Sequence, residues 1–125
     1  MIEINSIIKT DNKDEQFYNY MGKMFGSRIV QRQTNDRIYD DNGKEWYLYI
    51  EDERVASFVS ISNNMIKNVY TIKDAYLVQI LETIRKEKKI KESIVPNLYK
   101  KLYEKAGFKI NPMNTLKNFV MIYDA

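Results

Sequence analysis

The chain has 125 residues, the length of one domain, and 44% of them are hydrophobic, which is enough for one packed core. It contains neither cysteine nor histidine. Their absence excludes disulfides, thiolate chemistry and imidazole-dependent nucleophiles, and it leaves a zinc ion without its usual ligands. A general base would have to be a carboxylate, a perturbed lysine, a tyrosine or a positioned water.

Hydropathy sets an expectation about location. No run approaches the roughly 20 apolar residues of a membrane span. The first ten residues, MIEINSIIKT, lack the basic and then apolar pattern of a signal peptide. We therefore expect a cytoplasmic protein without a membrane partner.

Positive charge is concentrated in the last third of the chain. The net charge is +3, but residues 85–117 hold ten Lys and Arg against three Glu, and the rest is net acidic. A basic half of this kind can meet a phosphate-bearing ligand, a nucleic acid or an acidic protein. The alternative is a solvated helix face with no partner.

In chain order, residues 2–8 predict a short strand. Apolar residues at helical spacing predict an amphipathic helix over 14–25, which Gly26 would end. Residues 28–33 fit either a strand or an irregular crossing. No internal repeat or linker interrupts this region.

The centre of the chain predicts three strands. The Asn-Gly pair at 42–43 is a hairpin signal, because this pair accepts the positive φ values of a type I′ turn. We therefore expect 36–40 to pair with a strand over 45–51. Alternating residues predict two further strands, over 54–62 and 65–72.

The strand over 45–51 has an aromatic face. Tyr47 and Tyr49 alternate with a face formed by Trp46 and its apolar neighbours. If Trp46 faces the core, the tyrosines face either a covering helix layer or the outside, where they could bind a protein or stack on bases. The carboxylates at 51–53 predict a solvated turn and no metal site, since three consecutive residues cannot all reach one ion.

The second half alternates helices and strands. An apolar stripe at i, i+3, i+4 and i+7 predicts a helix over 75–89. A strand over 92–96 follows. Next we expect a helix that is capped by Asn97, ends at Gly107 and carries Leu98, Leu102 and Ala106 on its apolar face. The last elements are a strand from 108, interrupted at Asn111-Pro112, and a strand over 117–124. The order predicts a single domain over 1–125, an α/β sandwich with a mixed, mostly antiparallel sheet and one parallel crossover.

Three stretches resemble the GNAT-type N-acetyltransferase family. They are YIEDERVASFVSI, VYTI with the helix that follows it, and IVPNLYKKLYEKAGFKI, in which LYEKAGF is the most specific part. Together they cover about 47–124. The resemblance implies a GNAT-like three-layer α/β sandwich, acetyl-CoA as cofactor, and an amine-bearing small molecule or protein as acceptor.

The resemblance also implies site residues. In the family the pantetheine arm lies where the fourth and fifth strands splay apart, which here are 65–72 and 91–95. A helix tyrosine that protonates the CoA thiolate corresponds to Tyr103. The implied cofactor contacts are Val69, Tyr70 and Thr71 on the strand, Ala75 and Tyr76 at the start of the next helix, and Asn97.

One part departs from the family pattern. The family places an Arg/Gln-x-x-Gly-x-Gly/Ala loop before its cofactor-binding helix, where main-chain N–H groups close around the pyrophosphate. The connection here, IKDAYL (72–77), has no glycine and is about four residues shorter. Asp74, an expected N-cap, puts a carboxylate where phosphates belong, so Lys73 or the basic tract would have to supply charge.

Two interpretations of the site residues stay open. In one, Tyr103 is the catalytic acid; in the other it is a core residue, and Asn97 and Asp74 only cap helices. The matching functions are an acetyl-CoA-dependent N-acetyltransferase and a catalytically inactive GNAT-fold module, regulatory or phage-type, that binds a protein through its tyrosine-rich or lysine-rich surface. A nucleic-acid-binding module is the third and is not favoured.

Overall fold

The structure is a computed structural model that describes residues 6–36, 38–40 and 43–124, with the backbone alone at 113–116. The strands are β1 (Ser6–Thr10), β2 (Glu45–Glu51), β3 (Arg54–Ser62), β4 (Met65–Thr71), β5 (Ser93–Pro96), β6 (Lys109–Leu116) and β7 (Phe119–Tyr123). The helices are α1 (Phe17–Phe25), α2 (Arg28–Thr34), α3 (Asp74–Glu87), the 3₁₀ turn η1 (Asn97–Tyr99) and α4 (Lys100–Lys105).

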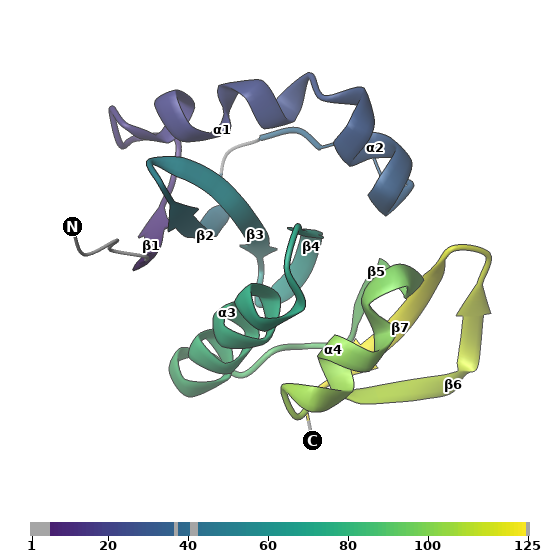
Figure 1. Cartoon of the computed structure of the whole chain (residues 1–125). Helices are drawn as coiled ribbons and strands as arrows, with labels where there is room; N and C mark the ends of the chain where they lie inside the picture. The colour runs from purple at the N-terminus through teal and green to yellow at the C-terminus, as the bar shows by residue number, and fades with distance from the viewer. Residues whose placement is uncertain (1–5, 37, 41–42, 125) are drawn as a thin grey trace.

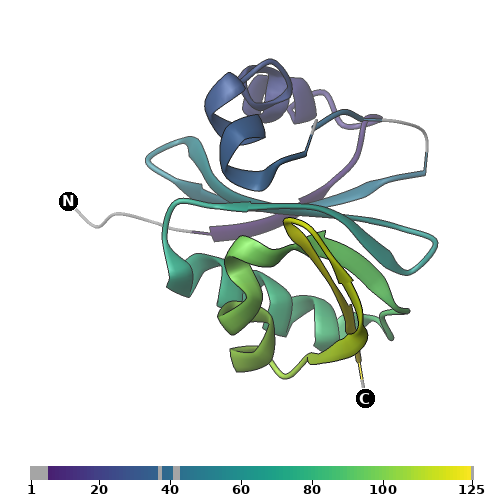
Figure 2. The ribbon, with the colours of Figure 1, turned by 90° about the vertical axis from the view of Figure 1, so that its right-hand side faces the viewer.

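The strands form two antiparallel sheets with the orders β1-β2-β3-β4 and β5-β7-β6. Helices α1 and α2 cover one face of the larger sheet, and α3 and α4 lie on the other side (Figures 1 and 2). The expected fold class, a GNAT-like three-layer α/β sandwich with mostly antiparallel pairing, is confirmed.

The two sheets meet at β4 and β5, which are in contact but share no ladder. Near their starts the Lys91 N–H donates to Asn64 O (2.8 Å) and the Ile66 N–H donates to Ser93 Oγ (2.9 Å). Residue numbers rise together on both sides, so the strands run in the same direction, as the crossover predicted. The expected single sheet is therefore divided in two along this line, because main-chain pairing does not continue past the starts.

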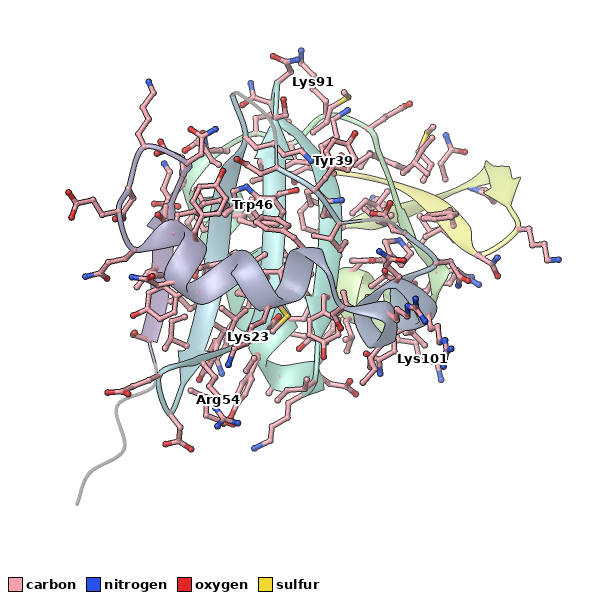
Figure 3. All side chains as sticks on the ribbon, turned by 90° about the horizontal axis from the view of Figure 1, so that it is seen from above. Lys23, Tyr39, Trp46, Arg54, Lys91 and Lys101 are labelled. Carbon is pink, nitrogen blue, oxygen red and sulfur yellow. The ribbon has the colours of Figure 1, made fainter. Side chains whose placement is uncertain are left out.

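The larger sheet has a hydrophobic core on each face. Trp46 is fully buried on the α1 side, where its ring contacts Phe17, Phe25 and Phe58. Figure 3 looks onto this layer and shows Trp46 close to α1. Tyr47, on the opposite face, is 1% exposed and belongs to the core formed with α3. The tyrosine face of β2 is thus covered by a helix layer and does not lie outside.

Two expectations for the N-terminal third are wrong. Residues 28–33 are neither a strand nor irregular but helix α2, which starts where Ser27 Oγ accepts the Val30 N–H (3.3 Å). The described residues of the next stretch, 36 and 38–40, do not pair with β2, because β1 occupies that edge from Ser6↔Ile50 to Thr10↔Trp46. Part of the expected hairpin turn, at 41–42, lies outside the described residues.

A network of polar side chains connects the segment between α2 and β2 to strands β3 and β4. The Asn68 side chain, 3% exposed, accepts hydrogen bonds from Lys44 Nζ (3.0 Å) and Ser60 Oγ (2.7 Å). Its Nδ2 donates to Asp36 Oδ2 (2.9 Å). Buried polar groups need such hydrogen-bond partners. Here the bond from Asn68 holds Asp36, the first residue of the stretch for which the sequence predicted a strand.

The region after β5 also differs from expectation. Asn97 makes no side-chain cap; it begins η1, and Pro96 occupies the cap position. Leu102 and Ala106 are buried as expected, but Leu98 is 61% exposed, and Tyr99 and Tyr103 are buried as well. The 3₁₀ turn rotates the residues relative to the helix that the spacing assumed. The interruption expected at Asn111-Pro112 appears as a register shift inside β6.

Gly107 ends α4 as expected. Its φ is +103°, its N–H donates to Glu104 O (3.0 Å), and the Phe108 N–H donates to Tyr103 O (3.0 Å). These two bonds define a Schellman motif. A Cβ at this position would lie 2.1 Å from Nη1 of Arg85, which donates to Ala106 O (3.1 Å).

We predict that Gly107→Ala lowers the free energy of unfolding by about 2–3 kcal/mol, since the left-handed backbone and the displaced Arg85 both add cost. Gly22→Ala is the matched control. Gly22 lies within α1 with no heavy atom within 4 Å of a built Cβ, so this change should stabilise by about 0.5–1 kcal/mol. Urea unfolding measures both, and equal effects would contradict the prediction.

Candidate functional site

The line where β4 and β5 diverge leads to the candidate site. At the end of β4, the Thr71 N–H finds no strand partner and donates to Tyr99 Oη (3.3 Å). Next to Tyr99, on the same side of the η1–α4 turn, Tyr103 donates its O–H to Pro96 O at the end of β5 (2.9 Å). One phenol is thus attached to each of the two diverging strands.

A cleft of about 520 Å³ opens beside Tyr99. Four elements contribute to its walls: α2, the end of β4, the start of α3, and the η1–α4 turn. The lining residues are Gln33, Thr71, Asp74 and 97–102. Figure 3 shows Lys101 at the same edge of the molecule as α2. The cleft therefore joins a main-chain strand end to a surface that carries charged side chains of both signs.

The charges of the cleft come from three exposed side chains. Lys100 and Lys101 stand on one wall and Asp74 on another. Asp74 is the first residue of α3 and not its N-cap, and no side-chain cap is made there. Its carboxylate lies in the first turn, where the helix dipole favours negative charge. An anionic ligand would meet the lysines favourably and Asp74 unfavourably.

The structure brings together two of the cofactor contacts that the resemblance implied, Thr71 and Asn97. Ala75 is exposed in the first turn of α3. Val69 is fully buried in the α3-side core, and Tyr70 packs against Phe58 on the other face of the sheet. These three residues do not line the cleft.

Tyr76 lies away from the cleft, at the end of β2. Its ring stacks on Tyr49, with centroids 3.9 Å apart and 9° between the planes. Its O–H donates to the Glu51 carboxylate, and Lys73 Nζ lies 3.6 Å from the same carboxylate. Lys73, expected as a source of positive charge for phosphates, is thus paired with Glu51.

Tyr103, the expected catalytic acid, is fully buried and does not line the cleft. Burial raises the pKa of Tyr103 well above its usual value. Burial also raises the pKa of Tyr99, although the hydrogen bond from Thr71 opposes this shift. Both phenols therefore keep their protons at neutral pH.

Sequence reasoning did not identify Tyr99 or Gln33 as cleft residues, and it anticipated Lys100 and Lys101 only as members of the basic tract that could supply charge. Tyr99 and Tyr103 are four residues apart, and this spacing places two side chains on one helix face. That signal could have paired Tyr99 with Tyr103. Gln33 had no such signal, because its position depends on α2 being a helix.

Two further findings concern the whole described part of the chain. Among residues 6–36, 38–40 and 43–124, no group of three or more Asp, Glu, His or Cys side chains could hold a metal ion. No helix within these ranges is long and apolar enough to cross a membrane.

Comparisons with known proteins concern the fold. No protein-family model matches the sequence, and no curated protein matches it. Among solved structures, the chain is similar to that of a CoA-dependent acyl-homoserine lactone synthase, BjaI, solved with SAM and isopentyl-CoA. The TM-score is 0.59 at 12% identity, over 95% of this chain and 80% of the other. At this identity the likeness shows the α/β architecture alone, and it agrees with the GNAT-like fold.

Buried tyrosines predict a loss of stability in alkali. The raised pKa values of Tyr70, Tyr99 and Tyr103 mean that the folded state keeps protons that the unfolded state releases above about pH 10. The free energy of unfolding should then fall by up to about 1.4 kcal/mol per pH unit for each such group.

Urea unfolding between pH 8 and pH 11 measures this fall. Tyr103→Phe should make the fall shallower, because it removes one of the buried phenols. Tyr18→Phe is the control, since the Tyr18 ring is 55% exposed. A flat profile to pH 11, or equal slopes for the two variants, would contradict the assignment of the fall to buried tyrosines.

Proposed function

We propose that this chain is a divergent GNAT-like acyltransferase domain that takes acetyl-CoA in the cleft at the end of β4 and transfers its acyl group to an amine. The observation that carries the proposal is the Thr71 N–H, a main-chain donor at the diverging strands that is bonded to a side chain, Tyr99 Oη, in the wall of a cleft with two lysines. The fold-level likeness to a CoA-dependent synthase also supports the proposal that the ligand is an acyl-CoA.

The amide and ammonium groups that line the cleft fit the polar parts of acetyl-CoA. Asn97 and Gln33 offer amide groups along the cleft, and Lys100 and Lys101 offer positive charge for phosphates. Because no glycine-rich loop precedes α3, phosphate binding depends on these side chains and not on clustered main-chain N–H groups. Each missing charge-assisted bond loses about 1.5–3 kcal/mol, so we expect a dissociation constant close to millimolar.

When bound, acetyl-CoA supplies an activated acyl thioester. The chain's own contribution would be orientation by the Thr71 N–H and a proton held at a tyrosine hydroxyl. Tyr103 remains the proposed proton donor, and Tyr99 stands nearer to the cleft as a second donor. A phenol whose pKa is raised above 10 is poorly matched to proton transfer near neutral pH, so we expect slow turnover.

A second candidate is a catalytically inactive GNAT-fold module that binds a protein partner. The buried hydroxyls of Tyr99 and Tyr103, each already hydrogen-bonded to the strands, favour it. The absence of a glycine-rich connection before α3 favours it too. Thermal unfolding with acetyl-CoA separates the two functions.

We predict that acetyl-CoA at about ten times its dissociation constant raises the free energy of unfolding by about 1.4 kcal/mol. In a domain of this size that corresponds to a Tm increase of about 4–6 °C. The double change Lys100→Glu/Lys101→Glu should abolish the increase, because both lysines line the cleft.

Lys86→Glu/Lys89→Glu is the matched control. These lysines are exposed and carry the same charge, but they do not line the cleft. The control should keep most of the increase. No Tm change for the wild type at about 10 mM acetyl-CoA, roughly ten times the expected dissociation constant, would remove the acyltransferase proposal and leave the inactive module.

Tyr103→Phe tests the proton donor. If Tyr103 acts as the acid, turnover should fall at least tenfold while acetyl-CoA affinity stays unchanged, since a proton donor contributes about 10²–10⁴-fold. The loss of the bond to Pro96 O should cost only about 1 kcal/mol of stability. Unchanged turnover with this small stability loss would assign Tyr103 to packing alone.

A further inference from the structure

Tyr99 and Tyr103 differ in how firmly they are held. Tyr103 is fully buried, and its O–H bond to Pro96 O is 2.9 Å long. Tyr99 lies on a three-residue 3₁₀ turn, forms part of the cleft wall, and its bond to the Thr71 N–H is 3.3 Å long. Tyr99 therefore has both the weaker attachment and open space beside its ring.

The Thr71 N–H can serve one strong acceptor at a time. In this structure the acceptor is the Tyr99 hydroxyl, so a ligand carbonyl reaches the strand end only after that hydroxyl leaves. Tyr99 is 5% exposed, lines the cleft and lies near the buried Tyr103. Rotation of the side chain about its Cα–Cβ bond would extend the cleft inward and free the donor in a single movement.

We infer that Tyr99 controls access to the site: a ligand with a carbonyl and an elongated arm enters by displacing the Tyr99 side chain from the Thr71 N–H. This inference rests on the proposed function, since it names the residue that an acyl-CoA would have to move. The observed affinity is then reduced by the small population of the open state. Substitutions that favour the open state, in which Tyr99 has left the Thr71 N–H, should raise the affinity for the ligand without adding any contact to it.

The test compares acetyl-CoA binding by calorimetry in the wild type and in Tyr99→Phe and Tyr99→Ala. The Phe variant removes the competing hydroxyl and should bind about fivefold tighter, the factor that one ordinary hydrogen bond represents. The Ala variant also removes the ring and should bind at least tenfold tighter. Tyr18→Phe is the control: it also removes a phenol hydroxyl, but Tyr18 is 55% exposed and does not line the cleft, so affinity should stay within about twofold.

Hydrogen exchange at the Thr71 amide gives a readout that does not depend on activity. In the free Tyr99→Phe protein this amide has lost its partner and should exchange faster than in the wild type, by about five- to tenfold. Acetyl-CoA should restore its protection. Exchange that is unchanged in Tyr99→Phe would show that Tyr99 does not hold this amide and would overturn the inference.

The outcomes separate the inference from the proposed function. If the wild type binds acetyl-CoA and both Tyr99 variants bind no tighter, Tyr99 is not the controlling residue, while the acyltransferase proposal stands. If no protein binds at millimolar ligand, including Tyr99→Ala with its enlarged cleft, the proposed function fails and the inference fails with it. Should the Ala variant not fold, as judged by circular dichroism, the Phe variant decides.

Discussion

The free side of β4 beyond Ile66 is the constraint on which the rest of this structure depends. No ladder joins β4 to β5, the Ile66 N–H donates to a side-chain oxygen, Ser93 Oγ, and every buried N–H still needs a partner. Side chains replace the missing ladder in two ways. Val69 of β4 and Val95 of β5 pack in one core with α3, and Tyr99 Oη accepts a hydrogen bond from the Thr71 N–H, the last amide of β4. Packing holds the two sheets together, and the strands need not be paired for the fold to be stable.

The same constraint explains the location of the cleft. Where two strands separate, the elements that follow them separate too, and here these are α3 after β4 and η1 after β5. Helix α2 closes the remaining side through Gln33. On the α1 side, aromatic packing around Trp46 fills the core, and a smaller cleft of about 300 Å³ opens beside the polar network around Asn68.

Much of this fold could be predicted from local patterns. Alternation predicted β2 to β4, the apolar stripe predicted α3, and Gly107 marked the end of α4. Features set by distant partners could not be predicted: α2 is only seven residues long and depends on its cap and on burial of Val30, and β1 takes an edge that the local Asn-Gly signal assigned to 36–40. For the site, the resemblance indicated Thr71 and Asn97. It did not indicate Tyr99, because the 3₁₀ turn changes which side chains face inward.

The single tryptophan of the chain has a practical consequence. Trp46 belongs to the core under α1, and its Nε1–H donates to Asp40 Oδ1 (3.0 Å). Tyr99 and Tyr103 belong to the core on the other side. Fluorescence emission excited at the indole therefore reports on one layer of the sandwich, and ultraviolet absorbance of the phenols includes the other. The indole is thus an optical label for the α1 side, whereas phenols lie on both sides, since Tyr70 belongs to the same core as Trp46.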